Sequence, residues 1–270
     1  MGEQYRIMGS CNGLLCLLNV HKHYMALWNP SIRITSKAFA FPTAISLYKS
    51  ITYQGLGYDH VNDKYKLLVV AIDHHETVTK LYTFGANSWK VIQNLPCRPN
   101  RLQAKFVSGT GTLNWIARTS DGGRWMILSF DLVTETYGEV FLPGGDADHV
   151  SIPELVFLSN CLLCISFFDS KKDHWAVWQM KEYGVLDSWT KVMSIPHFNQ
   201  GVCNWNGFTI TPHSLVPLCI SEDGIILFRT TFSKWVVYNP NDGSMACLGI
   251  RAHYWLNMHT YHQSLVSPQL

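Results

Sequence analysis

The chain has 270 residues, a formal net charge of +2 and only 15% charged residues. This small positive excess is not clustered, which excludes the strongly basic face expected of a nucleic-acid-binding domain. No apolar run approaches the roughly 18 residues of a membrane span, and the N-terminus lacks the basic-then-apolar pattern of a secretory signal. We therefore expect no nucleic-acid or membrane partner, and a cytoplasmic or nuclear location.

Short β-rich runs separated by turn residues follow one another along the chain. The clearest group of four covers Lys105–Gly109, Thr112–Ala117, Trp125–Asp131 and Tyr137–Pro143. Apolar residues alternate along these runs, as in strands with one buried face. The other units should place their first two strands, in chain order, at Tyr5–Ser10 and Gly13–Leu18, Tyr53–Tyr58 and Tyr65–Val70, Leu155–Ser159 and Leu162–Ser166, and Val216–Ile220 and Gly224–Phe228.

An aromatic residue followed by turn residues marks the third strand of every unit. These aromatics lie 46 to 60 positions apart and are Trp28, Phe84, Phe130, Trp178 and Tyr238. Repeats of roughly 40–50 residues with four strands each are typical of propeller blades. The sequence thus predicts an all-β, β-propeller-like (kelch-type) array of about five to six four-stranded antiparallel blades in one domain spanning residues 1–270. An ordinary β-sandwich is the alternative architecture.

The end of the chain is expected to complete the array. Ala252 to Val266 has room for one or two further strands. A propeller protects its strand edges by closing on itself. We therefore expect a strand around Tyr261 to Val266 to lie beside the N-terminal unit.

Cysteine and histidine do not form a recognisable metal site. Four of the eight cysteines, Cys16, Cys164, Cys219 and Cys247, lie in apolar strands and are expected to be buried as small hydrophobic side chains. Cys161-Leu-Leu-Cys164 lacks a second pair at zinc spacing. His21, His23, His74 and His75 fall in predicted loops without a third ligand nearby. We predict no metal and no disulfide framework.

Catalytic motifs are also missing from the sequence. Thr119–Trp125 resembles the Asp-box turn of sialidase-type propellers, but it occurs once and is one residue short, so we interpret it as a hairpin. Ser108–Thr112 is rich in Gly but lacks the Gly-Lys-Ser/Thr end of a P-loop, and there is no Gly-x-Ser-x-Gly elbow. We predict no enzyme and no cofactor. A carbohydrate-binding or sialidase-like propeller is the alternative, although it should carry several Asp boxes.

Loops on a rigid scaffold are the usual place for recognition. If each blade keeps a sequential strand order, the loops between second and third strands share one face with the loops that join successive units. The longest of these, Pro196 to Leu215, is rich in aromatic residues, and aromatic and Arg side chains dominate binding hot spots. The predicted partner-binding residues are His21, His23, His74, His75, Arg98, Arg101, Asp169, Lys171, Lys172, Asp173, Phe198, Trp205 and Phe208.

An ordered set of phrases resembles the plant F-box-associated domain, of the F-box/kelch-repeat and S-locus F-box type. The phrases lie at Gly9–Leu17, Leu27–Arg33, Gly55–Asp59, Asn62–Leu67, Leu128–Glu135, Trp178–Gly184, Ser188–Lys191, Ser221–Gly224 and Tyr261–Ser267. They cover nearly the whole chain in order.

The resemblance implies a protein-interaction module. In this family an N-terminal F-box docks a Skp-type adaptor of a cullin-based ubiquitin ligase, and the associated domain holds the protein to be ubiquitylated. A strand is expected from about Tyr5, so we expect no F-box before it and no docking of the adaptor by this chain. The expected partner is an unidentified protein bound on the loop face. An inactive, truncated family member is a further alternative.

Overall fold

The computed structural model describes residues 5–42, 51–72, 77–101, 104–143, 152–158, 163–169, 174–196, 215–230, 235–248 and 261–269. Strands dominate these ranges, and the one helical element in them is a three-residue 3₁₀ turn, η1 (Leu186–Ser188). Within the same ranges, no helix is both long and apolar enough to cross a bilayer. The prediction of an all-β, propeller-type array of four-stranded antiparallel blades is confirmed.

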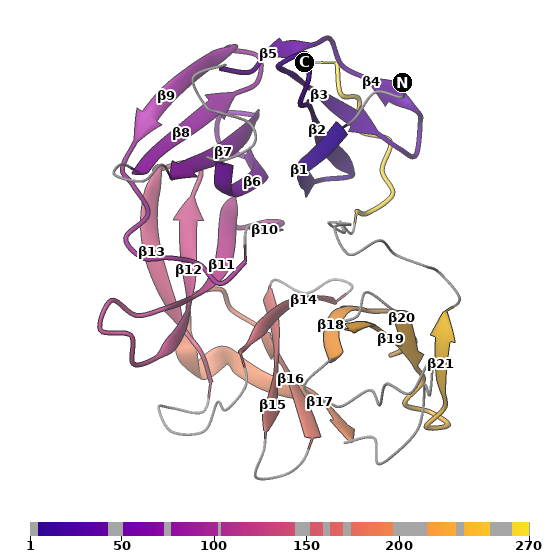
Figure 1. The fold of residues 1–270 in the computed structure, drawn as a ribbon. Coiled ribbons are helices and arrows are strands. Elements are labelled where there is room, and N and C mark those ends of the chain that lie inside the picture. Colours follow the sequence, from indigo (N-terminus) through magenta and orange to yellow (C-terminus); the bar gives the residue numbers. More distant parts are fainter. Residues whose placement is uncertain are drawn as a thin grey trace. The chain divides into compact units, whose positions relative to one another are not determined.

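Strands pair in sequential order within each sheet (Figure 1). The first sheet holds β1 (Tyr5–Cys11), β2 (Leu14–Asn19), β3 (Tyr24–Asn29) and two short strands that both pair with β3, β4 (Ile34–Thr35) and β5 (Phe39–Ala40). The second holds β6 (Ile51–Asp59), β7 (Lys64–Ile72), β8 (Thr77–Thr83) and β9 (Ser88–Ile92). The third holds β10 (Lys105–Val107), β11 (Thr112–Arg118), β12 (Trp125–Asp131) and β13 (Thr136–Phe141).

The remaining strands form two further antiparallel groups of four. One contains β14 (Glu154–Leu158), β15 (Leu163–Asp169), β16 (His174–Met180) and β17 (Trp189–Pro196); the other contains β18 (Leu215–Ile220), β19 (Ile226–Thr230), β20 (Trp235–Tyr238) and β21 (Met245–Leu248). Parallel pairing of β14 with β18 joins the two groups into one eight-stranded sheet. The described residues therefore contain five four-stranded groups, at the lower end of the predicted five to six.

The chain divides into two compact units. The first comprises residues 1–122, 126–139 and 259–270, and the second comprises residues 123–125 and 140–258. The core of the second unit lies between the β14–β17 and β18–β21 groups. It is built from the buried side chains of Val156, Trp175, Val177, Ile195, Leu215, Ile220, Ile226, Phe228, Val236 and Tyr238.

Within the first unit, the second sheet is covered on both faces. Tyr65, Leu67 and Val69 of β7 pack into a core shared with the first sheet, whereas Leu68 and Val70 face a core shared with the third. Successive strand residues point to opposite faces, so both the odd and the even positions of β7 must be apolar. This explains why β7 reads as a nearly continuous apolar run rather than an alternating one.

Two glycines allow the sheets of this unit to approach closely. A Cβ added at Gly9 of β1 would lie 2.5 Å from the Leu56 backbone nitrogen of β6. A Cβ added at Gly57 of β6 would lie 2.4 Å from Leu132 Cδ1. Real Cβ atoms do not reach such distances, so these positions require Gly for packing rather than for backbone conformation.

One turn design recurs at five hairpins and provides the repeated turn chemistry of the sequence. An Asn or Asp at the end of a strand accepts a hydrogen bond from the backbone N–H two residues later, which is an Asx turn. The residue four positions after it has a positive φ, between 52° and 70°. The five pairs are Asn19/His23, Asn29/Arg33, Asp59/Asp63, Asp131/Glu135 and Asn239/Gly243.

The C-terminal segment, residues 261–269, lies against the first sheet as predicted, but not as a strand. It has no regular secondary structure. Its polar contacts instead run to the two turns at one end of that sheet, Asn12–Gly13 and Asn29–Ser31. The prediction was thus right about the location of the segment and wrong about its backbone pairing, and residues 252–260 lie outside the described ranges.

The cysteines mostly follow the prediction. Cys11 and Cys16 are buried free thiols of the first sheet, and burial raises the pKa of each. Cys247 in β21, in contrast, is disulfide-bonded. The expectation of a chain without disulfides is therefore wrong at Cys247.

Candidate functional site

The loops between second and third strands occupy the predicted positions in all five groups. They join β2 to β3, β7 to β8, β11 to β12, β15 to β16, and β19 to β20. The sequential strand order on which the loop-face prediction depends is therefore present. Of the predicted partner-binding residues, His74, His75, Lys171, Lys172, Asp173, Phe198, Trp205 and Phe208 lie outside the described residues.

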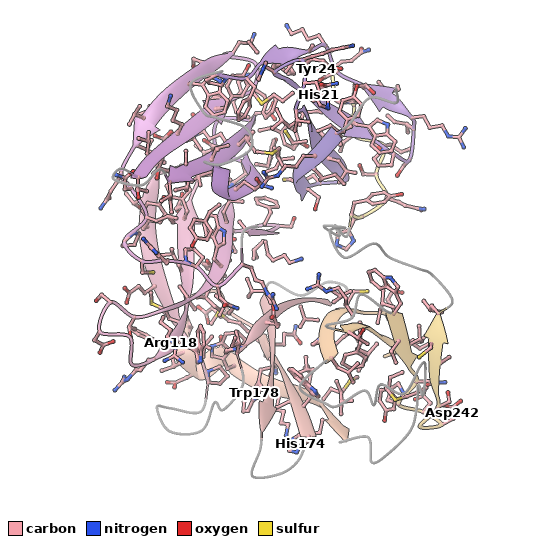
Figure 2. The ribbon with its side chains drawn as sticks, viewed as in Figure 1. His21, Tyr24, Arg118, His174, Trp178 and Asp242 are labelled. Atoms are coloured by element: carbon pink, nitrogen blue, oxygen red, sulfur yellow. The ribbon has the colours of Figure 1, made fainter. Side chains whose placement is uncertain are left out.

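The β2–β3 hairpin presents a basic tip. Asn19 is buried, and its Oδ1 accepts hydrogen bonds from the backbone N–H groups of His21 (3.2 Å) and Lys22 (2.9 Å). His23 then reverses the chain with φ 53°. The three residues from His21 to His23 are exposed (Figure 2). The predicted loop positions of His21 and His23 are confirmed, and Lys22 belongs with them.

The segment before β10 brings two arginines into register at one end of the third sheet. Pro99 forms an antiparallel bridge with Ala117 of β11, and the Asn100 backbone N–H donates to the Ile116 carbonyl at 2.7 Å. Counting back one residue and forward one residue, Arg98 stands opposite Arg118. Residues directly opposite in an antiparallel pair have Cβ atoms about 4.5–5.5 Å apart on the same face. The two loop sets of the prediction therefore meet here.

Arg118 was not predicted from the sequence. It ends β11, and its Nη1 donates to the Gly122 carbonyl of the β11–β12 hairpin at 2.9 Å (Figure 2). The Gly122 backbone N–H donates to the Thr119 carbonyl at 2.7 Å, and Thr119 Oγ1 donates to the Asp121 carboxylate. The interpretation of this motif as a hairpin is thus confirmed. A signal was present in the sequence, because Arg118 follows a run of buried residues, Thr112 to Ala117.

Arg98 lies close to buried groups of the second sheet. Burial raises the pKa of Tyr53 in β6, and the positive charge of Arg98 opposes that rise. Burial also raises the pKa of the neighbouring Cys97 thiol, with a smaller contribution from the Glu139 carboxylate. Both Arg98 and Arg101 are exposed. The prediction that this segment presents arginines at the surface is confirmed.

In the second unit, the end of the β15–β16 pair is the one predicted position that falls within the described residues. Asp169 is the last residue of β15 and pairs in register with His174 of β16. His174 Nε2 lies 2.8 Å from Lys191 Nζ. No cluster of three His, Cys, Asp or Glu side chains suited to a metal occurs among the described residues.

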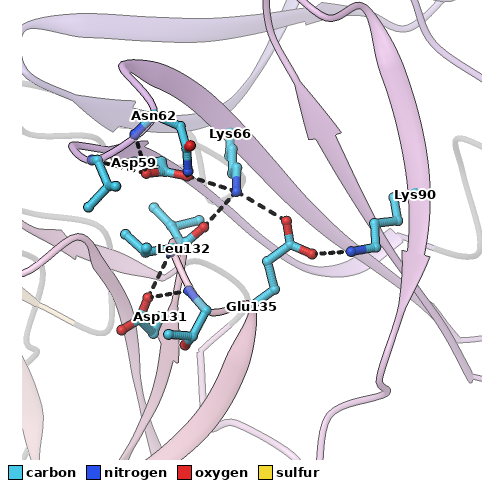
Figure 3. Close-up of polar contacts among 10 residues, drawn as sticks. Asp59, Asn62, Lys66, Lys90, Asp131, Leu132 and Glu135 are labelled. Carbon is cyan, nitrogen blue, oxygen red and sulfur yellow. Dashed lines mark hydrogen bonds and ion pairs between the residues drawn. The ribbon is translucent and has the colours of Figure 1, made fainter.

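A buried charged network in the first unit has the residue types of an acid–base site. Lys66 Nζ contacts Asp59 Oδ2 at 2.9 Å, Glu135 Oε1 at 3.1 Å and the Leu132 carbonyl at 2.6 Å (Figure 3). An ammonium group has three N–H donors, so Lys66 is saturated. Glu135 also contacts Lys90 at 2.6 Å. This arrangement ties the second sheet to the third and holds no donor or acceptor in reserve for chemistry at Lys66.

The two carboxylates are held in their charged form. Burial would raise the pKa of Asp59, but hydrogen bonds from Asn62 and Lys66 outweigh it, and the pKa lies below its ordinary value. Glu135 behaves in the same way, because Lys90 and Lys66 outweigh burial and lower its pKa. A general acid or base needs a pKa near the working pH, so these shifts favour a structural ion network.

Comparisons with known proteins give the chain its family. The model of the F-box associated beta propeller domain matches residues 3–267. The Arabidopsis thaliana F-box/kelch-repeat protein At3g23880 is 28% identical over 246 residues, which cover 89% of this chain and 63% of that protein. The F-box protein CPR1 from the same plant is 29% identical over 72% of this chain and 53% of its own length.

A third Arabidopsis thaliana relative, the F-box protein At3g07870, is 23% identical over 89% of this chain and 64% of its own length. The chain therefore spans between about half and two thirds of these relatives. The family match extends over almost every residue, and the four-stranded repeats provide the structure that the family's name describes. The chain belongs to the F-box associated beta propeller domain family.

Proposed function

We propose that this chain is a protein-recognition module that holds a target protein through the loops at one end of its blades. In relatives that carry an F-box, the held protein would be presented to an SCF-type ubiquitin ligase. The observation that supports the proposal most directly is the meeting of two loop sets at the third sheet, where Arg98 stands opposite Arg118. Exposed arginines on a rigid scaffold are typical of interaction hot spots.

The buried interior of the first unit fits a scaffold better than an active site. Its charged network is saturated, and the pKa of each carboxylate in it is lowered. The exposed polar residues of the loops His21 to His23 and Arg98 to Arg101, in contrast, are carried on well-packed sheets. This division between a rigid core and a charged loop end is what target binding requires.

The experiment is a cross-linked pull-down from plant extract with the chain as bait, followed by mass spectrometry. The wild-type chain is compared with a loop variant, His21→Ala/Lys22→Ala/Arg98→Ala. The matched control is Glu222→Ala/Asp223→Ala in the exposed β18–β19 turn, at the other end of its blade. We expect the wild type and the control to capture the same proteins and the loop variant to lose them.

The Skp-type adaptor and the cullin are scored separately from the captured proteins. Capture that the loop variant retains in full would contradict the proposed site of recognition. Capture of no protein above an empty-resin background would contradict the proposed function. Co-purification of the adaptor with the wild-type chain would contradict the expectation that this chain does not dock the ligase.

A further inference from the structure

We propose that the end of the third sheet where Arg98 stands opposite Arg118 is an oxyanion-binding site that receives carboxylate or phosphate groups of an acidic target segment. The proposal rests on the proposed function and names the chemistry of its partner. It uses three exposed arginines of the first unit, Arg98, Arg101 and Arg118. Of these, Arg118 was found only in the structure.

The register of the backbone creates the site. The bridge between Pro99 and Ala117 places the two flanking arginines opposite each other across an antiparallel pair. Like charges in directly opposite positions destabilise a sheet. An anion bound between the two guanidinium groups would replace this repulsion with two attractive contacts. The pair is therefore a feature whose cost an acidic ligand would offset.

The geometry of Arg118 gives the site a fixed component. Its Nη1 donates to the Gly122 carbonyl at 2.9 Å, which orients the guanidinium on the β11–β12 hairpin before any ligand arrives. A guanidinium has five N–H donors in a planar fork that matches a carboxylate or a phosphate in a bidentate manner. A group oriented in advance loses less side-chain freedom on binding.

The nearby carboxylates do not neutralise the pair in the described contacts. Asp121 is engaged by Thr119 Oγ1 in the hairpin tip. Glu139 makes itself felt at the Cys97 thiol, whose pKa it helps to raise. Arg98 in turn opposes the rise in the pKa of Tyr53. Three basic groups and two acidic ones leave a local positive excess at this end of the sheet.

The scale of the site matches a short acidic segment rather than nucleic acid. Nucleic-acid binding uses a long basic stripe that contacts many phosphates, whereas this site has three arginines in a chain of net charge +2. Charge-assisted bidentate contacts are directional and short, which suits one or two side chains of a protein. Acidic residues or phosphorylated residues of the target would supply the same oxyanion chemistry.

The test uses fluorescence anisotropy of the full chain with three labelled peptides: hexaglutamate, a Gly-Ser peptide with two phosphoserines, and hexalysine. The variants are Arg98→Glu, Arg118→Glu and Arg118→Lys. The control is Arg33→Glu, an exposed charge reversal in the β3–β4 turn. Glu is tolerated there because Glu135 occupies the equivalent turn position with φ 57°. Thermal unfolding checks that each variant is folded.

We expect either acidic peptide to bind the wild type, and each charge reversal to weaken binding by about tenfold or more, the equivalent of ~1.4 kcal/mol. Arg118→Lys should weaken binding less, because it keeps the charge and loses the fork, and Arg33→Glu should change it by less than about twofold. Preference for the phosphoserine peptide would identify phosphate as the ligand, and equal binding of hexaglutamate would identify carboxylate. Unchanged binding by Arg98→Glu, or binding of hexalysine equal to that of hexaglutamate, would overturn the proposal.

The same variants separate this proposal from the proposed function. If the wild type captures proteins from extract and Arg98→Glu captures them equally well, the oxyanion site is wrong and target recognition stands. If the wild type captures no protein but binds an acidic peptide in an Arg98-dependent manner, the oxyanion site stands and the proposed function fails.

Discussion

Asn29 and Ser264 are separated by 235 residues, yet the Asn29 side-chain amide donates a hydrogen bond to the Ser264 backbone carbonyl at 3.0 Å. The same Nδ2 donates to the Val266 carbonyl at 2.8 Å, while Oδ1 accepts from the Ser31 backbone N–H at 2.8 Å. Asn29 is fully buried. One amide side chain therefore sets the β3–β4 turn and fastens the C-terminal segment to it.

The substitution Asn29→Asp should release the C-terminal segment while keeping the turn. The carboxylate retains the acceptor for the Ser31 N–H but offers no donor to the two carbonyls, which it would repel. Two lost hydrogen bonds and two unsatisfied carbonyls correspond to about 2–4 kcal/mol. Hydrogen exchange of residues 261–269 should accelerate by at least about tenfold.

Asn19→Asp is the matched control for this change. Asn19 sets the same kind of turn through its Oδ1, and its hydrogen bonds go to His21 and Lys22. Exchange of the C-terminal segment should be the same in this variant as in the wild type. Slow exchange of the segment in Asn29→Asp would mean that contacts other than Asn29 hold it.

Gly13→Ala should destabilise the same junction by a steric route. A Cβ at Gly13 would lie 2.1 Å from Ser264 Oγ and 2.7 Å from the His262 carbonyl, and Gly13 has φ +78°. Gly109→Ala is the comparison, because its φ of +84° is similar and no atom lies within 4 Å of the added Cβ. Gly109→Ala should cost about 1 kcal/mol from backbone strain alone, and Gly13→Ala about 1–3 kcal/mol more from overpacking. Equal losses in denaturant unfolding would show that the segment does not press on Gly13.

The local elements of this fold could be predicted from the sequence because their causes are local. Alternating apolar residues and turn-forming Asn or Asp placed β10 to β13 within a residue or two of their observed bounds. The same turn chemistry located the β2–β3 loop and its two histidines. Arg98 and Arg101 were correctly expected at the surface because they follow a Pro-rich turn.

The features that could not be predicted depend on contacts between distant residues. Lys66 interrupts an apolar strand, and its partners Leu132 and Glu135 lie 66 and 69 positions later in the chain. The apolar tail around Val266 reads as a strand, but Asn29 captures its carbonyls with a side chain instead of a backbone ladder. Arg118 gained significance only through the Pro99 bridge, which no local pattern indicates.

Lys66→Met should be strongly destabilising. It keeps the length of the side chain but leaves Asp59, whose side chain is fully buried, without its cationic partner. Removing one member of a buried ion pair typically costs about 3–5 kcal/mol. The free energy of unfolding in urea should fall by about that amount.

Lys90→Met tests whether this loss reflects burial. Lys90 contacts the same Glu135, at 2.6 Å, but 68% of its side chain is exposed. Exposed pairs contribute about 0–1 kcal/mol, so this variant should lose little stability. Comparable losses in Lys66→Met and Lys90→Met would contradict the view that the buried contacts of Lys66 stabilise the junction of the second and third sheets.

Stability should fall in acid because of Asp59 and Glu135. The pKa of each is lowered in the folded protein, whereas unfolded chains titrate near about 3.9 for Asp and about 4.3 for Glu. The unfolded state therefore binds protons first as the pH falls, which favours unfolding. The contribution of these groups is complete above about pH 5 and is lost as the pH falls through the lowered folded pKa values.

Asp59→Asn removes one of these titrations and should change the pH profile in a defined way. At pH 7 the variant lacks the ion pair with Lys66 and should be less stable than the wild type by about 2–4 kcal/mol. At about pH 3 the wild type has begun to protonate Asp59 as well, so the difference between the two proteins should shrink. Urea unfolding at pH 7, 5, 4 and 3 measures both curves. A difference that stays constant over this range would show that the Asp59 carboxylate does not titrate with the stability of the fold.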